Sequence, residues 1–252
     1  MTLWESIAVL AAGVGAGMIN VIVGSGTLIT FPVLLAVGIP PVTANVSNSF
    51  GLVPGSLSGV IGYRRELVGQ GRRVLRMGTA SLLGGLLGAL LLIKLPSGAF
   101  DTIVPVLILL ALVLVVIQPR VAKAVAARRR LGGDPDGSPV LLIGVFLTGI
   151  YGGYFGAAQG VLLMALMGML LQEDLQRINA VKNALAMIVN AVAALFFLFT
   201  STVNWAAAGL IAAGSLVGGL LGAKVGRRLP PTALRGVIVV VGLVAVAKLL
   251  LS

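Results

Sequence analysis

Two short polar stretches interrupt the apolar sequence, one in each half of the chain. Each stretch combines glycines with hydroxyl or amide side chains, and an asparagine-containing patch follows it; the second patch also holds a lysine. These groups are hydrogen-bond donors and a cation, which suits the binding of an anion. We therefore expect substrate binding at Gly24, Ser25, Gly26, Thr27, Asn45, Asn48, Ser49, Gln159, Gly160, Asn179, Lys182 and Asn183.

Each polar stretch breaks an apolar segment that is too long for one ordinary membrane span. A helix that restarts after such a break presents free N–H groups and the positive end of its dipole, and both attract an anion. Irregular backbone at membrane depth must be buried in protein or line a cavity, so the breaks should face the interior. The alternative is that the glycines only permit tight packing.

The asparagines and the lysine have structural alternatives as well. Asn45 and Asn179 lie near the expected start of a helix, where asparagine often serves only as an N-cap. Asn48 and Asn183 lie about one turn further in, so capping explains them less well. Lys182 either attracts the anion or extends its side chain to the cytoplasmic surface, because a cation inside a span costs about 2.5–3.5 kcal/mol.

The composition indicates a polytopic membrane protein. Apolar residues make up 58% of the chain and charged residues 10%, whereas soluble domains contain about 25% charged residues. The net charge of +11 comes from Lys and Arg between apolar segments, which favours topology signals and contacts with the lipid bilayer over nucleic acid. The sequence has no Cys and no His, so disulfides, haem, iron–sulfur clusters and His-ligated metals are excluded, and we expect no cofactor.

The seven acidic residues all lie at predicted segment ends or in loops. No carboxylate is therefore expected at the membrane centre to carry a proton or a cation, and an anion is the better match for the path. The sequence also has no HExxH motif, no Cys nucleophile and no clustered carboxylates, so we do not expect an enzyme.

Eight apolar segments position these residues: 3–37, 42–63, 74–95, 99–117, 140–171, 175–199, 205–225 and 232–251. The first segment of each half is the broken one, with breaks at 20–26 and 152–160. We expect one transmembrane domain of the all-α class. It comprises repeat one (1–118), a basic cytoplasmic linker (119–138) and repeat two (139–252), and each repeat has a broken or re-entrant segment plus three spanning helices.

The two halves match each other along the sequence. The run Gly-Gly-Leu-Leu-Gly-Ala at 84–89 recurs at 218–223, Leu-Pro at 95–96 recurs at 229–230, and Gly26 corresponds to Gly160. With one residue of slippage, Val-Ser-Asn at 46–48 corresponds to Val-Lys-Asn at 181–183. The same spacing over this length indicates an internal repeat.

The charges indicate that the repeats have opposite orientations. Basic loops at 64–76, 120–130 and 224–228 should be cytoplasmic, whereas the uncharged loop at 200–204 should be outside. The segment 3–37 then starts and ends outside, the segment 140–171 starts and ends inside, and both termini lie outside. Inverted repeats with broken helices are typical of secondary transporters whose substrate binds near the midplane. This argument does not distinguish a re-entrant hairpin from two short spans.

The sequence resembles the TauE/SafE family of sulfite exporters, including permeases of the 4-toluene sulfonate uptake kind. The resemblance rests on runs from both halves and covers nearly the whole chain: 13–17, 24–26, 43–48, 54–59, 178–183, 203–205 and 214–223. It implies a bacterial inner-membrane permease for small sulfur anions, with Asn48, Lys182 and Asn183 near the substrate path. One departure is the short Gly-Ser-Gly at 24–26, where members often carry a longer glycine run.

Three functions fit this sequence. We expect a secondary transporter of sulfite, a sulfonate or sulfoacetate that works by alternating access between the repeats. The alternatives are a passive anion channel and a membrane scaffold without transport. The partners we expect are the small anionic substrate, the lipid bilayer and a second copy of the chain in a homodimer.

Overall fold

The computed structural model describes residues 1–95, 97–128 and 138–225, together with positions 236, 239, 240 and 243. Helices and the loops that join them make up these residues. The helices are α1 (Leu3–Ile22), α2 (Thr27–Ala36), α3 (Pro41–Gly62), α4 (Gly71–Lys94), α5 (Ser97–Arg128), α6 (Pro139–Tyr154), α7 (Gln159–Leu170), α8 (Leu175–Thr200) and α9 (Trp205–Val225). The prediction of an all-α fold is confirmed.

Within the described part of the chain, α1, α4, α8 and α9 are long and apolar enough to cross a membrane. Helix α3 was expected to span as well and has 22 residues, but polar residues in its first half make it less apolar. The apolar part of α5, Thr102–Ile117, is shorter than a full span. Most of the expected last segment, 232–251, and residues 129–137 of the expected linker lie outside the described residues.

The helix breaks are short. The first separates α1 from α2 at residues 23–26, and the second separates α6 from α7 at residues 155–158. Helices α2 and α7 have 10 and 12 residues, about 15 and 18 Å at 1.5 Å per residue, so neither can cross a core of about 30 Å. Each pair therefore forms a hairpin whose second helix is too short to cross, and the re-entrant placement of the hairpins in the membrane stays a prediction.

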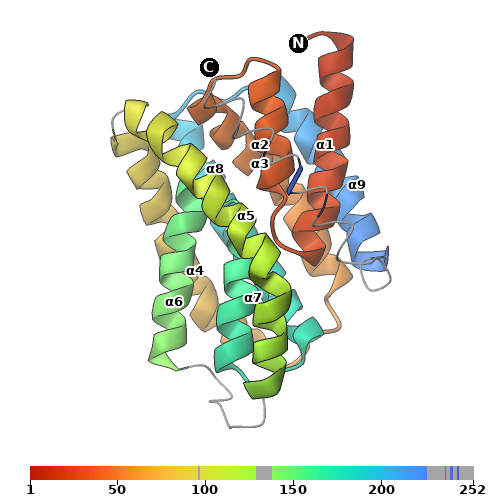
Figure 1. Cartoon of the computed structure of the whole chain (residues 1–252), viewed down its shortest axis with the longest axis vertical. Helices are drawn as coiled ribbons and strands as arrows, with labels where there is room; N and C mark the ends of the chain where they lie inside the picture. Colours follow the sequence, from red (N-terminus) through yellow and green to blue (C-terminus); the bar gives the residue numbers. More distant parts are fainter. Residues whose placement is uncertain (96, 129–137, 226–235, 237–238, 241–242, 244–252) are drawn as a thin grey trace.

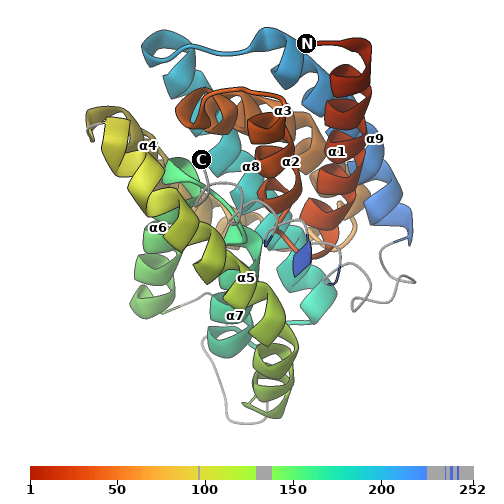
Figure 2. The ribbon, with the colours of Figure 1, turned by 45° about the horizontal axis from the view of Figure 1, so that its top comes forward.

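The two hairpins enter from opposite ends of the molecule. Figure 1 shows α1 descending from the end that holds the N-terminus, with α2 turning back toward it, whereas α6 and α7 do the same from the other end. The view in Figure 2 shows the same arrangement, with the breaks inside the helical bundle. The opposite entry agrees with the charge-based orientation, while a two-fold relation between complete repeats stays a prediction.

Glycines allow the first helix of each hairpin to pack tightly against a helix of the other half. Helix α1 contacts α9, and helix α6 contacts α4. A Cβ atom added to Gly218 in α9 would lie 1.9 Å from the Val14 carbonyl oxygen, and one added to Gly88 in α4 would lie 2.0 Å from the Ile150 carbonyl oxygen. Because small residues let helix backbones touch, these glycines fix both hairpins against the opposite half.

We expect Gly218→Ala to destabilise the protein by roughly 1–3 kcal/mol, because the added methyl group must push α1 and α9 apart. Gly209→Ala in the same helix is the matched control, since a Cβ there meets nothing within 4 Å. It should leave stability unchanged or raise it, as alanine is the better helix former. Thermal unfolding in detergent measures both effects, and equal melting temperatures for the two variants would contradict the prediction.

Helix α5 differs from the expectation that its segment ends at residue 117, because it continues through the start of the expected linker to Arg128. The sequence from 120 to 128 consists of Ala, Val, Lys and Arg without glycine. Alanine, arginine and lysine are good helix formers, so the chain continues the helix after Pro119.

Candidate functional site

The breaks of the two hairpins meet each other. The Gly160 N–H donates a hydrogen bond of 3.0 Å to the Gly24 carbonyl oxygen. A Cβ atom on Gly24 would lie only 2.4 Å from the Gly160 Cα, and Gly24 adopts a φ of +86° that favours glycine. Only two glycines allow this approach, so Gly24 and Gly160 form the contact between the hairpins.

Lys182 of α8 binds the end of α1. Its side chain is fully buried, and its Nζ donates to the Asn20 carbonyl at 2.9 Å and to the Val21 carbonyl at 3.0 Å. The last carbonyls of a helix lack intrahelical partners and carry partial negative charge, which a lysine compensates. The alternative in which Lys182 extends to the surface is therefore wrong.

Asparagines of each half bind the end of the broken helix in the other half. Asn179 and Asn183 donate to the Val21 carbonyl at 3.3 and 3.4 Å. In the other half, Asn45 of α3 donates to the carbonyl of Tyr154, the last residue of α6, at 2.9 Å. Each half thus caps the carbonyl end of the other half's broken helix.

The N-cap alternative for Asn45 and Asn179 is also wrong. Helix α3 begins at Pro41 and helix α8 at Leu175, with Pro40 and Asp174 at the N-cap positions. Both asparagines therefore lie inside their helices. Their side chains are free to leave their own helix and bind the opposite hairpin.

Asn48 binds the start of α2 in its own half. Its Nδ2 donates to the Thr27 hydroxyl at 3.1 Å, and its Oδ1 accepts from the Thr30 hydroxyl. Ser49 donates to the Asn45 carbonyl one turn earlier at 3.0 Å, so its hydroxyl is used within α3. Both Asn48 and Ser49 are buried, and Asn48 acts here by fixing α2.

Several buried polar atoms around the breaks have no hydrogen-bond partner among the described residues: Ser25 Oγ, Gln159 Nε2, Asn45 Oδ1, Asn179 Oδ1 and Tyr154 Oη. Ser25 and Gln159 are 1% and 4% exposed, and in the chain they adjoin Gly24 and Gly160, so they flank the hairpin contact. Buried polar groups are nearly always paired, and exceptions often mark functional positions.

The backbone adds further donors at this point. The N–H groups of Ser25, Gly26 and Thr27 have no backbone acceptor within the described part of the chain, and these residues lead into α2, which begins at Thr27. Among all the residues that the structure describes, Lys182 is the only one with a charged side chain that is buried. The site therefore offers a serine hydroxyl, an amide, helix N–H groups and one nearby ammonium, a set that suits a small anion.

A metal centre has no support in the described residues, since no group of three or more acidic, His or Cys side chains occurs there. Sequence reasoning missed Thr30 and Tyr154. Thr30 lies one turn after the break, a spacing that could have pointed to it. Tyr154 participates through its backbone carbonyl, which carries no sequence signal.

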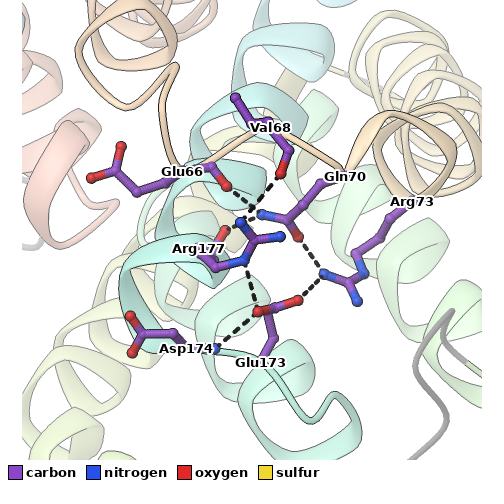
Figure 3. Close-up of polar contacts among 7 residues, drawn as sticks. All are labelled: Glu66, Val68, Gln70, Arg73, Glu173, Asp174 and Arg177. Atoms are coloured by element: carbon purple, nitrogen blue, oxygen red, sulfur yellow. Dashed lines mark hydrogen bonds and ion pairs between the residues drawn. The ribbon is translucent and has the colours of Figure 1, made fainter.

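A second polar cluster closes one end of the molecule (Figure 3). Glu173, between α7 and α8, accepts hydrogen bonds from Arg73 of α4 at 2.9 Å and from Arg177 of α8 at 2.7 Å. Gln70 donates to the Arg177 carbonyl at 3.1 Å, and Arg177 donates to the Val68 carbonyl at 3.2 Å. These bonds join the loop after α3 to the start of α8, and so they link the two halves.

The charge state of Glu173 should control this cluster. Burial alone would raise the pKa of Glu173, but the hydrogen bonds from Arg73 and Arg177 outweigh burial and hold the pKa below its ordinary value. A carboxyl with a lowered folded-state pKa stabilises the fold above its unfolded-state pKa, and this contribution is lost as the pH falls through the folded-state pKa.

We expect Glu173→Gln to lower the free energy of unfolding by about 1 kcal/mol at pH 7. The difference from the unmodified protein should shrink as the pH falls below about 4.5, toward the folded-state pKa of Glu173. Thermal unfolding between pH 7 and pH 3 measures this. Asp174→Asn is the control, because its side chain is exposed and takes no part in the ion pairs; a pH-independent deficit for Glu173→Gln would contradict the argument.

Comparison with known proteins gives consistent matches over nearly the whole chain. The family described as "Sulfite exporter TauE/SafE" matches residues 9–249. The "Probable membrane transporter protein YfcA" of Escherichia coli (strain K12) is 30% identical over 240 residues, which cover 93% of this chain and 86% of that protein. A "Probable membrane transporter protein" of Haemophilus influenzae is 29% identical over 237 residues, covering 94% of this chain and 91% of that protein.

Proposed function

The chain belongs to the sulfite exporter TauE/SafE family, a family of membrane transporters, and we propose that it carries a small sulfur-containing anion across the bacterial inner membrane. Sulfite, a sulfonate or sulfoacetate is the substrate class. The observation that carries the proposal is the contact of the two breaks at Gly24 and Gly160, with unpartnered buried donors beside it. The protein acts as a secondary transporter and not as an enzyme.

The chemistry of the donors supports an oxyanion. Sulfite and sulfonate groups present oxygens that accept several hydrogen bonds. Donors are available from the side chains of Ser25 and Gln159 and from the N–H groups that lead into α2. Lys182 lies beside Gly160, since a Cβ there would be 3.0 Å from the Lys182 Cδ. Its ammonium binds the Asn20 and Val21 carbonyls and adds favourable charge near the site.

Contacts between the halves at both ends support alternating access. At one end, Glu173 joins Arg73 and Arg177. At the other, the Asn204 N–H donates to the Ser47 hydroxyl at 2.9 Å, and Trp205 packs against Phe50. If the contacts at one end open while those at the other end stay closed, the central site is exposed to one side of the membrane at a time.

Flux measurements on purified protein in liposomes test the proposal. We expect saturable uptake of radiolabelled sulfite, an anionic sulfonate or sulfoacetate under a substrate gradient, and none of a hydrophilic organic cation of similar size. Flux far above transporter turnover, without counter-transport, would favour a passive anion channel. The absence of flux for every sulfur anion under any gradient would contradict transport and favour a scaffold.

A further inference from the structure

A basic hollow lies where α3 and α9 end, away from the hairpin contact. It has a volume of about 280 Å³ and is lined by Gly62, Arg64, Arg65, Glu66, Ala223 and Lys224. The helices touch at its edge, because a Cβ atom on Gly62 would lie 2.2 Å from the Ala223 Cβ. Nothing in the proposed transport path uses this hollow.

The hollow is electropositive. Arg64, Arg65 and Lys224 contribute three cations against the single carboxylate of Glu66. Figure 3 shows this carboxylate pointing away from Arg177, while the Glu66 backbone carbonyl accepts from Gln70 of the Glu173 cluster at 2.8 Å. Guanidinium groups form paired hydrogen bonds with phosphate oxygens, and an ammonium adds a mobile point charge. A phosphate group is therefore the ligand chemistry that these side chains would recognise.

The surroundings of the hollow indicate that the phosphate belongs to a lipid. Ile61, next to Gly62, is 48% exposed, and Leu221 and Val225, on either side of Lys224, are 41% and 38% exposed. These apolar side chains would contact the acyl chains of a lipid. A free phosphate has no acyl chains and would leave them without a partner. The hollow also lies at the end of the molecule that the basic loops assign to the cytoplasm, where anionic lipids attract Lys and Arg.

We propose that the hollow between the ends of α3 and α9 binds the phosphate of an anionic phospholipid headgroup. The lipid joins the two helix ends through Arg65 on one side and Lys224 on the other. Arg64 has a second role, since it donates to the Ile61 carbonyl at 3.3 Å and caps α3. This inference rests on membership of a membrane protein family and is independent of the transported substrate.

Native mass spectrometry of the full chain in neutral detergent tests the proposal with dioleoylphosphatidylglycerol as the probe. We expect one phosphatidylglycerol molecule per chain to remain bound. The double variant Arg65→Gln/Lys224→Gln should weaken binding about five-fold for each cation removed. The control Arg76→Gln/Arg120→Gln removes the same charge outside the hollow and should bind as the unmodified protein does.

Two further probes identify the source of the phosphate. Dioleoylphosphatidylcholine should bind more weakly, and inorganic phosphate should not displace phosphatidylglycerol from the unmodified protein. Equal binding by both double variants, equal binding of phosphatidylcholine, or displacement by inorganic phosphate overturns the proposal. Melting temperatures in lipid-free detergent check that the variants are folded, and the displacement experiment needs no variant.

Discussion

Transport should fall at least about 100-fold when Lys182 is replaced by methionine, which keeps the length of the side chain and removes its charge. The ammonium donates to the Asn20 and Val21 carbonyls at 2.9 and 3.0 Å. One hydrogen bond to a charged group contributes about 1.5–3 kcal/mol, and each 1.4 kcal/mol corresponds to a factor of ten. Losing both bonds would release the end of α1 and shift Gly24 away from Gly160. Flux into liposomes at fixed protein amount measures the effect.

Lys182→Gln separates the two roles that we assign to this lysine. The amide can still donate to a carbonyl of α1, so the melting temperature should recover more than half of the loss seen with methionine. The positive charge is gone, so a substrate attracted by it should show a raised KM. Lys94→Met is the matched control because Lys94 is exposed at the end of α4. Unchanged flux in Lys182→Met would contradict both roles.

The position of each break followed from the sequence because local signals mark it. Glycine and polar residues inside an apolar run indicate interrupted helix, and the basic loops indicate the side from which each hairpin enters. The expected breaks at 20–26 and 152–160 contain the observed ones at 23–26 and 155–158. The observed lengths of α2 and α7 add that the second helix of each hairpin is too short to cross a membrane.

The partners of the polar residues could not be predicted in the same way. Asn45 and Asn179 looked like helix caps because they lie within about one turn of the helix starts, which were expected at 42 and 175 and are observed at Pro41 and Leu175. Their carbonyl partners lie more than 100 residues away, and a backbone carbonyl has no residue-specific signature. The role of Lys182 depends on where α1 ends in space, so a surface position was equally compatible with the sequence.

For Glu173, too, the sequence indicates the nearby partner but not the distant one. Glu173 and Arg177 are four residues apart on adjoining loop and helix, a spacing that indicates a local ion pair. Arg73 is 100 residues away, and only the packing of α4 beside α8 brings it to Glu173. The substrate-binding role of the polar residues at the two breaks stays a prediction, whereas their positions around the breaks are observed.

Gly160→Ala should abolish transport while most of the helices stay folded. The added Cβ would lie 2.5 Å from the Gly24 Cα and 3.0 Å from the Lys182 Cδ. A lysine side chain can move, but the Gly24 backbone cannot without breaking the hydrogen bond from Gly160 N–H to Gly24 O. Overpacking of this kind destabilises by about 1–3 kcal/mol, so circular dichroism should remain helical with a lowered melting temperature.

The comparison with Gly209→Ala decides whether the hairpin contact itself matters for transport. Both variants add one methyl group to a helix, but Gly209 has open space and lies away from the breaks. Gly209→Ala should therefore transport normally. Gly218→Ala is the second comparison, since it strains the α1–α9 packing but leaves the contact between Gly24 and Gly160 intact. If Gly160→Ala lost no more activity than Gly218→Ala at equal melting temperature, general destabilisation would explain the loss. A larger loss in Gly160→Ala would assign it to the contact where the two hairpins meet.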